Sequence, residues 1–180
     1  MARKKRSEVE SSAASPTSSE KPVPTGAPRF CVVAIGASAG GIEAFKQMLH
    51  ALPRDTGMAF VLVLHLPAGH ESLLTDILGR VSAIPVIEVY DRVPIEPDRA
   101  YVLPAGADLD VSNGQLMLTP RQAQPGHHLS IDHFLHSLAQ HHGEKAIGII
   151  LSGNAADGTV GIQEIKAAGG ITPATKSLPP

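Results

Sequence analysis

The chain has 180 residues, about the length of one domain, and its 15 Lys and Arg against 17 Asp and Glu leave a formal net charge of −2. That balance argues against a broad nucleic-acid-binding surface, and a single cysteine rules out an internal disulfide and suits a reducing compartment. Because tryptophan is absent and aromatic residues make up 3 % of the chain, the core must consist mainly of Val, Ile, Leu and Ala, which is typical of an α/β sheet.

Residues 1–29 are rich in Ser, Pro, Glu and Lys and contain few apolar side chains. Such a segment cannot bury enough apolar surface to offset the entropy lost on ordering. We therefore expect a disordered tail or linker over residues 1–29 and a folded domain over residues 30–180. No apolar run is long enough to insert into a membrane.

The folded domain is expected to begin with a buried strand at residues 30–35, an apolar run rich in β-branched residues. The sequence GASAGG at residues 36–41 then allows a sharp turn. A helix should follow at once, since apolar residues recur at three- and four-residue steps from Ile42 onwards. This arrangement places Ser38 at the carboxyl edge of a sheet, among backbone N–H groups.

Three interpretations of the turn are open from these residues alone. As Gly-x-Ser-x-Gly it fits a nucleophile elbow, in which Ser38 attacks a carbonyl and the next N–H helps to bind the oxyanion. As a glycine-rich strand-to-helix turn it could hold a dinucleotide pyrophosphate. The simplest alternative is that small residues only permit close packing of strand and helix.

The strand–helix pattern then repeats. Residues 59–64 (AFVLVL) are expected to form a second buried strand that ends at His65, and residues 84–89 a third. Between them a helix should bury one apolar face, which consists of Leu73, Leu74, Ile77, Leu78 and Val81. This βαβαβ succession predicts a parallel sheet with right-handed crossovers.

Shorter strands follow at residues 100–103, 107–111 and 115–119. Asn113-Gly114 joins the last two, and Asn-Gly between alternating apolar runs is a strong hairpin signal. The helical period returns at Ser130. The buried face of that helix should consist of Ile131, Phe134, Leu135 and Leu138.

Residues 146–151 (AIGIIL) predict another buried strand, residues 160–168 another helix, and Ile171 begins a last strand. The expected fold class is therefore α/β, with a doubly wound, mostly parallel sheet and an inserted antiparallel β-hairpin. Because Pro173 cannot donate to a strand ladder and no covering helix follows, we expect the C-terminal end of the domain to be truncated.

Three polar residues are predicted at the carboxyl edge of this sheet, where doubly wound folds bind their ligands. Ser38 follows the first strand, His65 closes the second, and Asp157 lies in the loop after residues 146–151. These are the parts of an acyl-transfer triad: Ser38 as nucleophile, His65 as general base and then acid, and Asp157 holding the His65 tautomer.

His65 separates the competing interpretations of the turn. A dinucleotide site would favour Asp or Glu at the end of the second strand, to bind ribose hydroxyls. The common α/β-hydrolase fold would need the order Ser, acid, His, whereas here the order is Ser, His, Asp. Taken singly, His65 could be a packed surface residue, and Asp157 could simply cap the helix that follows it.

The remaining histidines crowd residues 127–142, and the helical period puts His133 and His136 on the solvent face of their helix. No nearby cysteine and no His-Glu-x-x-His spacing supports a zinc site, so we expect neither a metal nor a cofactor.

Several motifs, in order and spacing, resemble the catalytic domain of the CheB protein-glutamate methylesterases, in particular the version fused to a methyltransferase module. The resemblance covers residues 30–172, and its motifs are VVAIGASAGGIEA, LVLHLP, HESLLTDIL, AYVLPAG, IDHFLHSLA, AIGIILSGNAADGTVGI and IKAAGGIT. It implies that residues 30–180 are a methylesterase-like catalytic domain with Ser38, His65 and Asp157 as the triad.

The resemblance also implies what the domain acts on. The reaction would be hydrolysis of glutamate γ-methyl esters, and deamidation of certain glutamines, on the cytoplasmic helices of chemoreceptors. Methyltransferase and receiver or kinase modules would be further partners, all in the cytoplasm. The oxyanion and substrate region would include Ala39, Gly40 and Asn154.

One departure concerns the loop before the aspartate, where Ala155 stands at a position that is usually glycine in the family. A Cβ there could shift an oxyanion donor. The alternative expectation is therefore a catalytically weak or inactive domain of the same fold that binds receptors or signalling partners.

Overall fold

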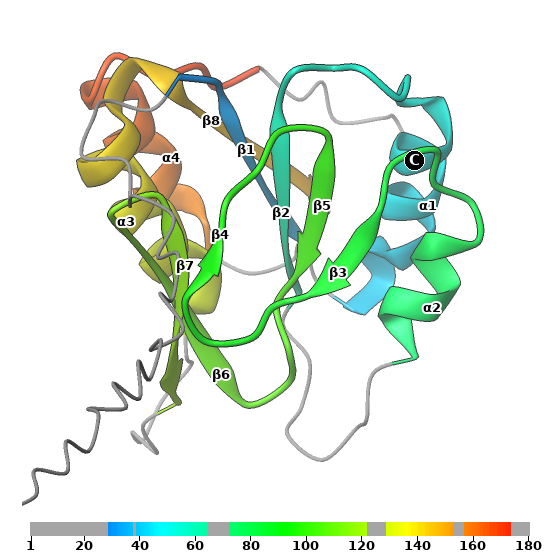
Figure 1. The fold of residues 1–180 in the computed structure, drawn as a ribbon. Helices are drawn as coiled ribbons and strands as arrows, with labels where there is room; N and C mark the ends of the chain where they lie inside the picture. Colours follow the sequence, from blue (N-terminus) through cyan, green and yellow to red (C-terminus); the bar gives the residue numbers. More distant parts are fainter. Residues whose placement is uncertain (1–28, 38, 65–72, 122–128, 153–156, 174–180) are drawn as a thin grey trace, which may run out of the picture.

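The computed structural model describes residues 29–37, 39–64, 73–121, 129–152 and 157–173 (Figure 1). The tail predicted at residues 1–29 lies, apart from Arg29, outside the described residues. No helix in these ranges has the length and hydropathy needed to cross a bilayer.

A five-stranded parallel sheet forms the centre of the domain, with the strand order β3-β5-β2-β1-β8. Its strands are β1 (Val32–Ala37), β2 (Ala59–Leu64), β3 (Val86–Glu88), β5 (Arg99–Val102) and β8 (Ala146–Ser152). A second, antiparallel sheet has the order β4-β7-β6 and consists of β4 (Val93–Pro94), β7 (Gln115–Pro120) and β6 (Ala107–Ser112). The predicted fold class, a mostly parallel sheet with an inserted antiparallel hairpin, is confirmed.

Helices cover both faces of the parallel sheet (Figure 1). They are α1 (Ile42–Ala51), α2 (Leu74–Gly79), α3 (Ser130–His142) and α4 (Thr159–Ala167), with short 3-10 turns η1 (Ala39–Gly41) and η2 (Gly143–Lys145). In β1, Val33 and Ile35 point into the core on the α1 and α2 side, whereas Val32 and Ala34 point towards α3. This alternation explains why the strand is apolar throughout.

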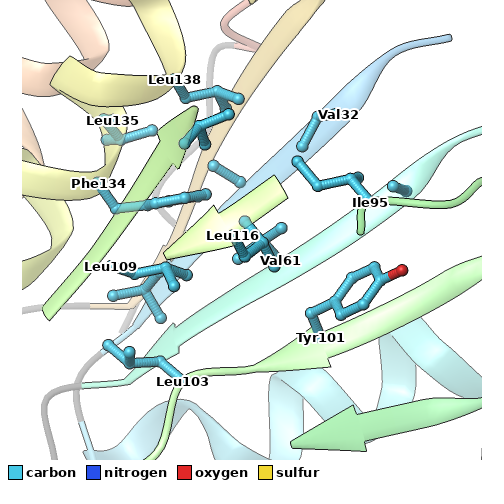
Figure 2. Close-up of a cluster of buried hydrophobic side chains, with 14 of the residues drawn as sticks. Val32, Val61, Ile95, Tyr101, Leu103, Leu109, Leu116, Phe134, Leu135 and Leu138 are labelled. Carbon is cyan, nitrogen blue, oxygen red and sulfur yellow. The ribbon is translucent and has the colours of Figure 1, made fainter. Parts of the chain in front are cut away.

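The core between the parallel sheet and α3 also contains the hairpin (Figure 2). Phe134 and Leu138 of α3 belong to the same buried cluster as Leu109 and Leu116 of the hairpin, and Phe134 lies beside Leu109, so that the small sheet and α3 together cover one face of the large one. The Asn113-Gly114 hairpin is present as predicted, since Ser112 pairs with Gln115 and both turn residues have positive φ.

Two features of the middle of the chain differ from the sequence prediction. The strand β5, which the sequence pattern groups with the short strands of the hairpin region, lies in the parallel sheet between β2 and β3. The helix α2 is six residues long and buries only Leu74 and Leu78, while Leu73 and Ile77 are 70 % and 40 % exposed. Leu73 and Ile77 share a stripe of the helix next to the buried one, and so short a helix buries a single stripe.

The chain reverses its direction of progress across the sheet at β1. It first runs from β1 to β2 on one side, and only later returns through α3 to β8 on the other side of β1. In open α/β sheets, such a reversal opens a crevice at the carboxyl ends of the two strands that flank it. That places the candidate site beyond the ends of β1 and β8.

Candidate active site

Three strands end side by side at this edge. Ala37, the last residue of β1, pairs with Leu64 at the end of β2 and with Ser152 at the end of β8. Neighbouring strands in a sheet lie about 4.8 Å apart. Ser38 and His65, which follow Ala37 and Leu64 directly in the chain, lie outside the described residues, but the backbone leads to both from the same row of the sheet.

The N-terminus of α3 packs directly over the end of β1. A Cβ placed on Gly36 would lie 2.5 Å from Cγ2 of Ile131 and 2.9 Å from Cδ1 of Ile150, so only glycine fits there. The glycine two residues before Ser38 is therefore needed for the approach of a helix. The sequence interpretation, in which small residues permit close packing, is right for Gly36.

Asp157, the third predicted triad residue, is held by that same helix end. Its carboxylate accepts the backbone N–H of Asp132 at 2.9 Å and that of Ile131 at 3.2 Å, and both donors belong to the first turn of α3. Such N–H groups have no partner within their own helix, and they favour a negative charge. The sequence suggested that Asp157 caps the helix that follows it, whereas these two bonds cap α3.

Gly158 fixes the direction in which the chain leaves Asp157. It has φ +96°, a left-handed conformation that side chains rarely adopt, and a Cβ there would lie 2.6 Å from Cδ1 of Ile150. Gly158 is also the N-cap residue of α4. Asp157 therefore lies between a constrained glycine on its own helix and the N–H donors of another.

The predicted oxyanion region is described only in part. Ala39 and Gly40 form the η1 turn with Gly41, immediately before α1. Gly40 is exposed, and no described atom lies within 4 Å of the position that a Cβ would occupy. Asn154 and Ala155 lie outside the described residues.

A buried polar cluster at the start of α3 was not found from the sequence. Arg121 donates from Nη2 to Oγ of Ser130 at 3.0 Å, and Ser130 donates to Oδ1 of Asp108 at 3.4 Å. Arg121 Nε and Asp108 Oδ1 are 3.9 Å apart. These bonds attach the first residue of α3 to the hairpin, and no pattern in the sequence joins residues so far apart.

Two of the histidines on α3 each contact one carboxylate. Nε2 of His133 lies 3.0 Å from Asp110, and Nδ1 of His136 lies 2.9 Å from Glu164, in both cases with exposed histidine side chains, as the helical period predicted. In the ranges that the structure describes, no three His, Cys, Asp or Glu side chains gather as a metal site would require.

The fold and this edge define a doubly wound α/β protein whose candidate site lies at the carboxyl ends of its parallel strands, with an acidic side chain held at a helix N-terminus. The model of the CheB methylesterase family matches residues 33–177, and the chain belongs to that family. The family resemblance seen in the sequence motifs is therefore confirmed.

Curated relatives and a solved structure agree with this assignment. The chain is 35 % identical over 145 residues to a protein-glutamate methylesterase/protein-glutamine glutaminase of Photorhabdus laumondii, and 37 % identical over 142 residues to one of Syntrophotalea carbinolica. These matches cover 78 % and 77 % of this chain but 41 % and 40 % of the relatives, so the chain spans about two fifths of their length. The crystal structure of the Thermotoga maritima CheB methylesterase catalytic domain matches with a TM-score of 0.71 and 28 % identity, over 79 % of this chain and 78 % of that one.

Proposed function

We propose that this domain is a serine hydrolase that removes methyl groups from glutamate γ-methyl esters of chemoreceptors and deamidates certain receptor glutamines. The observation that carries the proposal is the convergence at one sheet edge of the β1 and β2 ends, which lead to Ser38 and His65, with Asp157 held nearby by the first turn of α3. Membership of the CheB methylesterase family, and the names of the curated relatives, support the reaction class.

In the proposed first step, Oγ of Ser38 attacks the ester carbonyl while His65 takes the hydroxyl proton. Asp157 holds the His65 ring in the tautomer that can accept that proton. The tetrahedral intermediate collapses with loss of methanol, which leaves with the proton from His65, and an acyl-enzyme remains on Ser38. Water then attacks with His65 as base, which releases glutamate. A glutamine side chain would follow the same steps with ammonia as the leaving group.

Charge on the carbonyl oxygen would develop next to the turn that follows Ser38. We assign its stabilisation to backbone N–H groups of the region containing Ala39, Gly40 and Asn154. The open space beside Gly40 supports this, because a substrate must approach the backbone there without meeting a side chain. The substrates would be methylated cytoplasmic helices of chemoreceptors, with methyltransferase and receiver or kinase modules as signalling partners.

Ser38→Ala tests the proposal directly. Membranes that carry a methylated chemoreceptor are incubated with the protein, and methanol release is measured. The wild-type chain should release methanol and Ser38→Ala should not. Ser112→Ala, a serine at the end of β6 away from the proposed site, is the matched control and should stay within about twofold of wild type. A Ser38→Ala protein with the wild-type rate would refute the assignment.

A further inference from the structure

The helices α3 and α4 are linked beside Asp157 by a second carboxylate, that of Asp132. Oδ1 of Asp132 accepts the backbone N–H of Gly161 at 2.7 Å, and this bond is buried. Gly161 lies in the first turn of α4, so its N–H is one of those that α4 itself cannot satisfy. Asp132 therefore caps α4 from another helix, just as Asp157 caps α3.

The two caps close a ring. The backbone N–H of Asp132 donates to Asp157, and the side chain of Asp132 accepts from Gly161, four residues further along the chain from Asp157. The segment from Asp157 to Gly161 is thus tied to α3 at both of its ends. Loss of the Gly161 bond would free the start of α4 to move against α3, and the backbone of Asp157 would move with it.

Packing around the ring prevents α3 and α4 from moving closer together. A Cβ on Gly161 would overlap the side chain of Leu135 and would lie 3.2 Å from Cα of Asp132, so the two helix backbones approach as closely as glycine allows. Asp132 itself is only 9 % exposed. A buried carboxylate is unfavourable unless its charge is compensated. Asp132 lies in the first turn of α3 and accepts an N–H from the first turn of α4, so the dipoles of both helices favour its negative charge.

We infer that Asp132 is a positioning residue for Asp157, acting through the Gly161 hydrogen bond, a role that rests on the proposed function of Asp157. It touches no reacting atom. Its carboxylate sets the position of α4 relative to α3 and thereby the place from which Asp157 orients His65. Displacement of a catalytic group by about 1 Å can lower turnover by as much as a hundredfold, so a hydrogen bond outside the reacting groups can control the rate.

Three substitutions separate this role from a general effect on stability. Asp132→Ala removes the acceptor, Asp132→Glu keeps the carboxylate but moves it by one methylene, and Asp132→Asn keeps an oxygen that can accept from Gly161. We expect kcat for methanol release from methylated receptor membranes to fall about 10- to 100-fold for Ala and Glu, with KM within about twofold. Asp132→Asn should stay within about threefold of wild type, because its amide oxygen preserves the bond.

Glu164→Ala is the matched control. Glu164 also joins α4 to α3, through His136 at 2.9 Å, but on an exposed face away from Asp157. It should leave kcat within about twofold of wild type. If Asp132→Ala does not fold, the comparison of kcat between Asp132→Glu and Asp132→Asn tests the inference.

Two results would overturn the inference: Ala and Glu variants with wild-type kcat, or an Asn variant that loses as much as they do. Failure of the proposed function would look different, because Ser38→Ala would then keep the wild-type rate whatever residue stands at position 132.

Discussion

The carboxylate of Asp157 receives its hydrogen bonds from a helix that precedes it by about two dozen positions in the chain, through the N–H groups of Ile131 and Asp132. Both backbone N–H groups donate to the carboxylate, so Asp157 acts as a hydrogen-bond acceptor and is held in place. An aspartate that holds a histidine N–H and stabilises an imidazolium acts as an acceptor in the same way. The residue can therefore act in the triad and anchor α3 at the same time.

Asp157→Asn should test both roles. An amide offers one acceptor oxygen in place of two, so one of the α3 bonds is lost, and its NH2 group would favour the wrong tautomer of His65. We expect kcat to fall by up to about four orders of magnitude, as in other triads, with a loss of about 1 kcal/mol in the free energy of unfolding. The measurements are methanol release and a urea titration. A change of kcat below about threefold would remove Asp157 from the triad.

His142 is a buried histidine that the sequence pattern did not reveal. It is 8 % exposed at the end of α3, and no described residue bonds its Nδ1. Burial, with a smaller contribution from the neighbouring His141, lowers the pKa of His142 to about 4. The folded protein therefore keeps this ring neutral over a pH range in which the unfolded chain protonates it.

The stability of the domain should consequently fall in mild acid. The unfolded chain takes up a proton at His142 below about pH 6.5, but the folded protein does so only below about pH 4, so between these values the unfolded state binds more protons. We expect His142 to contribute a loss of about 2–3 kcal/mol as the pH falls from 6.5 to 4.

Urea titrations at several pH values measure this contribution. His142→Gln should show a shallower pH dependence than wild type over that window, whereas His50→Gln, an exposed histidine on α1, should match wild type. Equal pH slopes for wild type and His142→Gln would contradict the burial argument.

At the scale of elements, the contact between β1 and α3 brings the parts of the site together. Ile131 covers Gly36, and the N–H of Ile131 donates to Asp157, so one residue packs against the strand that leads to Ser38 and holds the proposed acid. The cluster of Asp108, Arg121 and Ser130 attaches the same helix end to the hairpin. The hairpin thus helps to fix the start of α3, which holds Asp157.

Gly36→Ala should disturb this contact. The new Cβ would press on the side chains of Ile131 and Ile150, and overpacking of this kind typically destabilises a protein by about 1–3 kcal/mol. Because the start of α3 must shift, we also expect kcat to fall. Gly79→Ala is the control: a Cβ at Gly79, in α2, meets no described atom within 4 Å and should leave stability unchanged or slightly higher.

Thermal unfolding and methanol release decide the outcome for Gly36→Ala. A variant as stable and as active as wild type would show that α3 can move away from β1 without effect on the site. In that case the position of Asp157 would not depend on the packing between the two elements.

At the scale of the whole molecule, hydrophobic periodicity predicted the fold well where elements are long. The strand β2 begins and ends where the sequence placed it, and α1 and α3 begin at the predicted Ile42 and Ser130. The bounds of β8 and α4 differ from the predicted ones by a single residue. Such segments bury one face or both, so the pattern of apolar residues reports the structure directly.

Features that depend on contacts distant in sequence were not predictable from the same pattern. The strand β4 has only two residues, and it exists because Val93 finds Leu116 of the hairpin as its partner. Likewise, the position of β5 between β2 and β3, the burial of His142 and the attachment of Asp157 to α3 depend on which elements become neighbours. The placement of Asp157 at the carboxyl edge was predictable, because a loop that follows a strand of a parallel sheet begins at that edge.

The central claim is that Ser38 is a nucleophile activated by His65 and Asp157, and its most direct test is covalent labelling. The folded protein is treated with a serine-directed fluorophosphonate, and the modified residue is identified by mass spectrometry. We predict stoichiometric modification at Ser38 in the wild-type chain and much slower modification in His65→Ala and Asp157→Asn. Absence of labelling at Ser38 in a protein shown to be folded, or equal rates in all three proteins, would contradict this account.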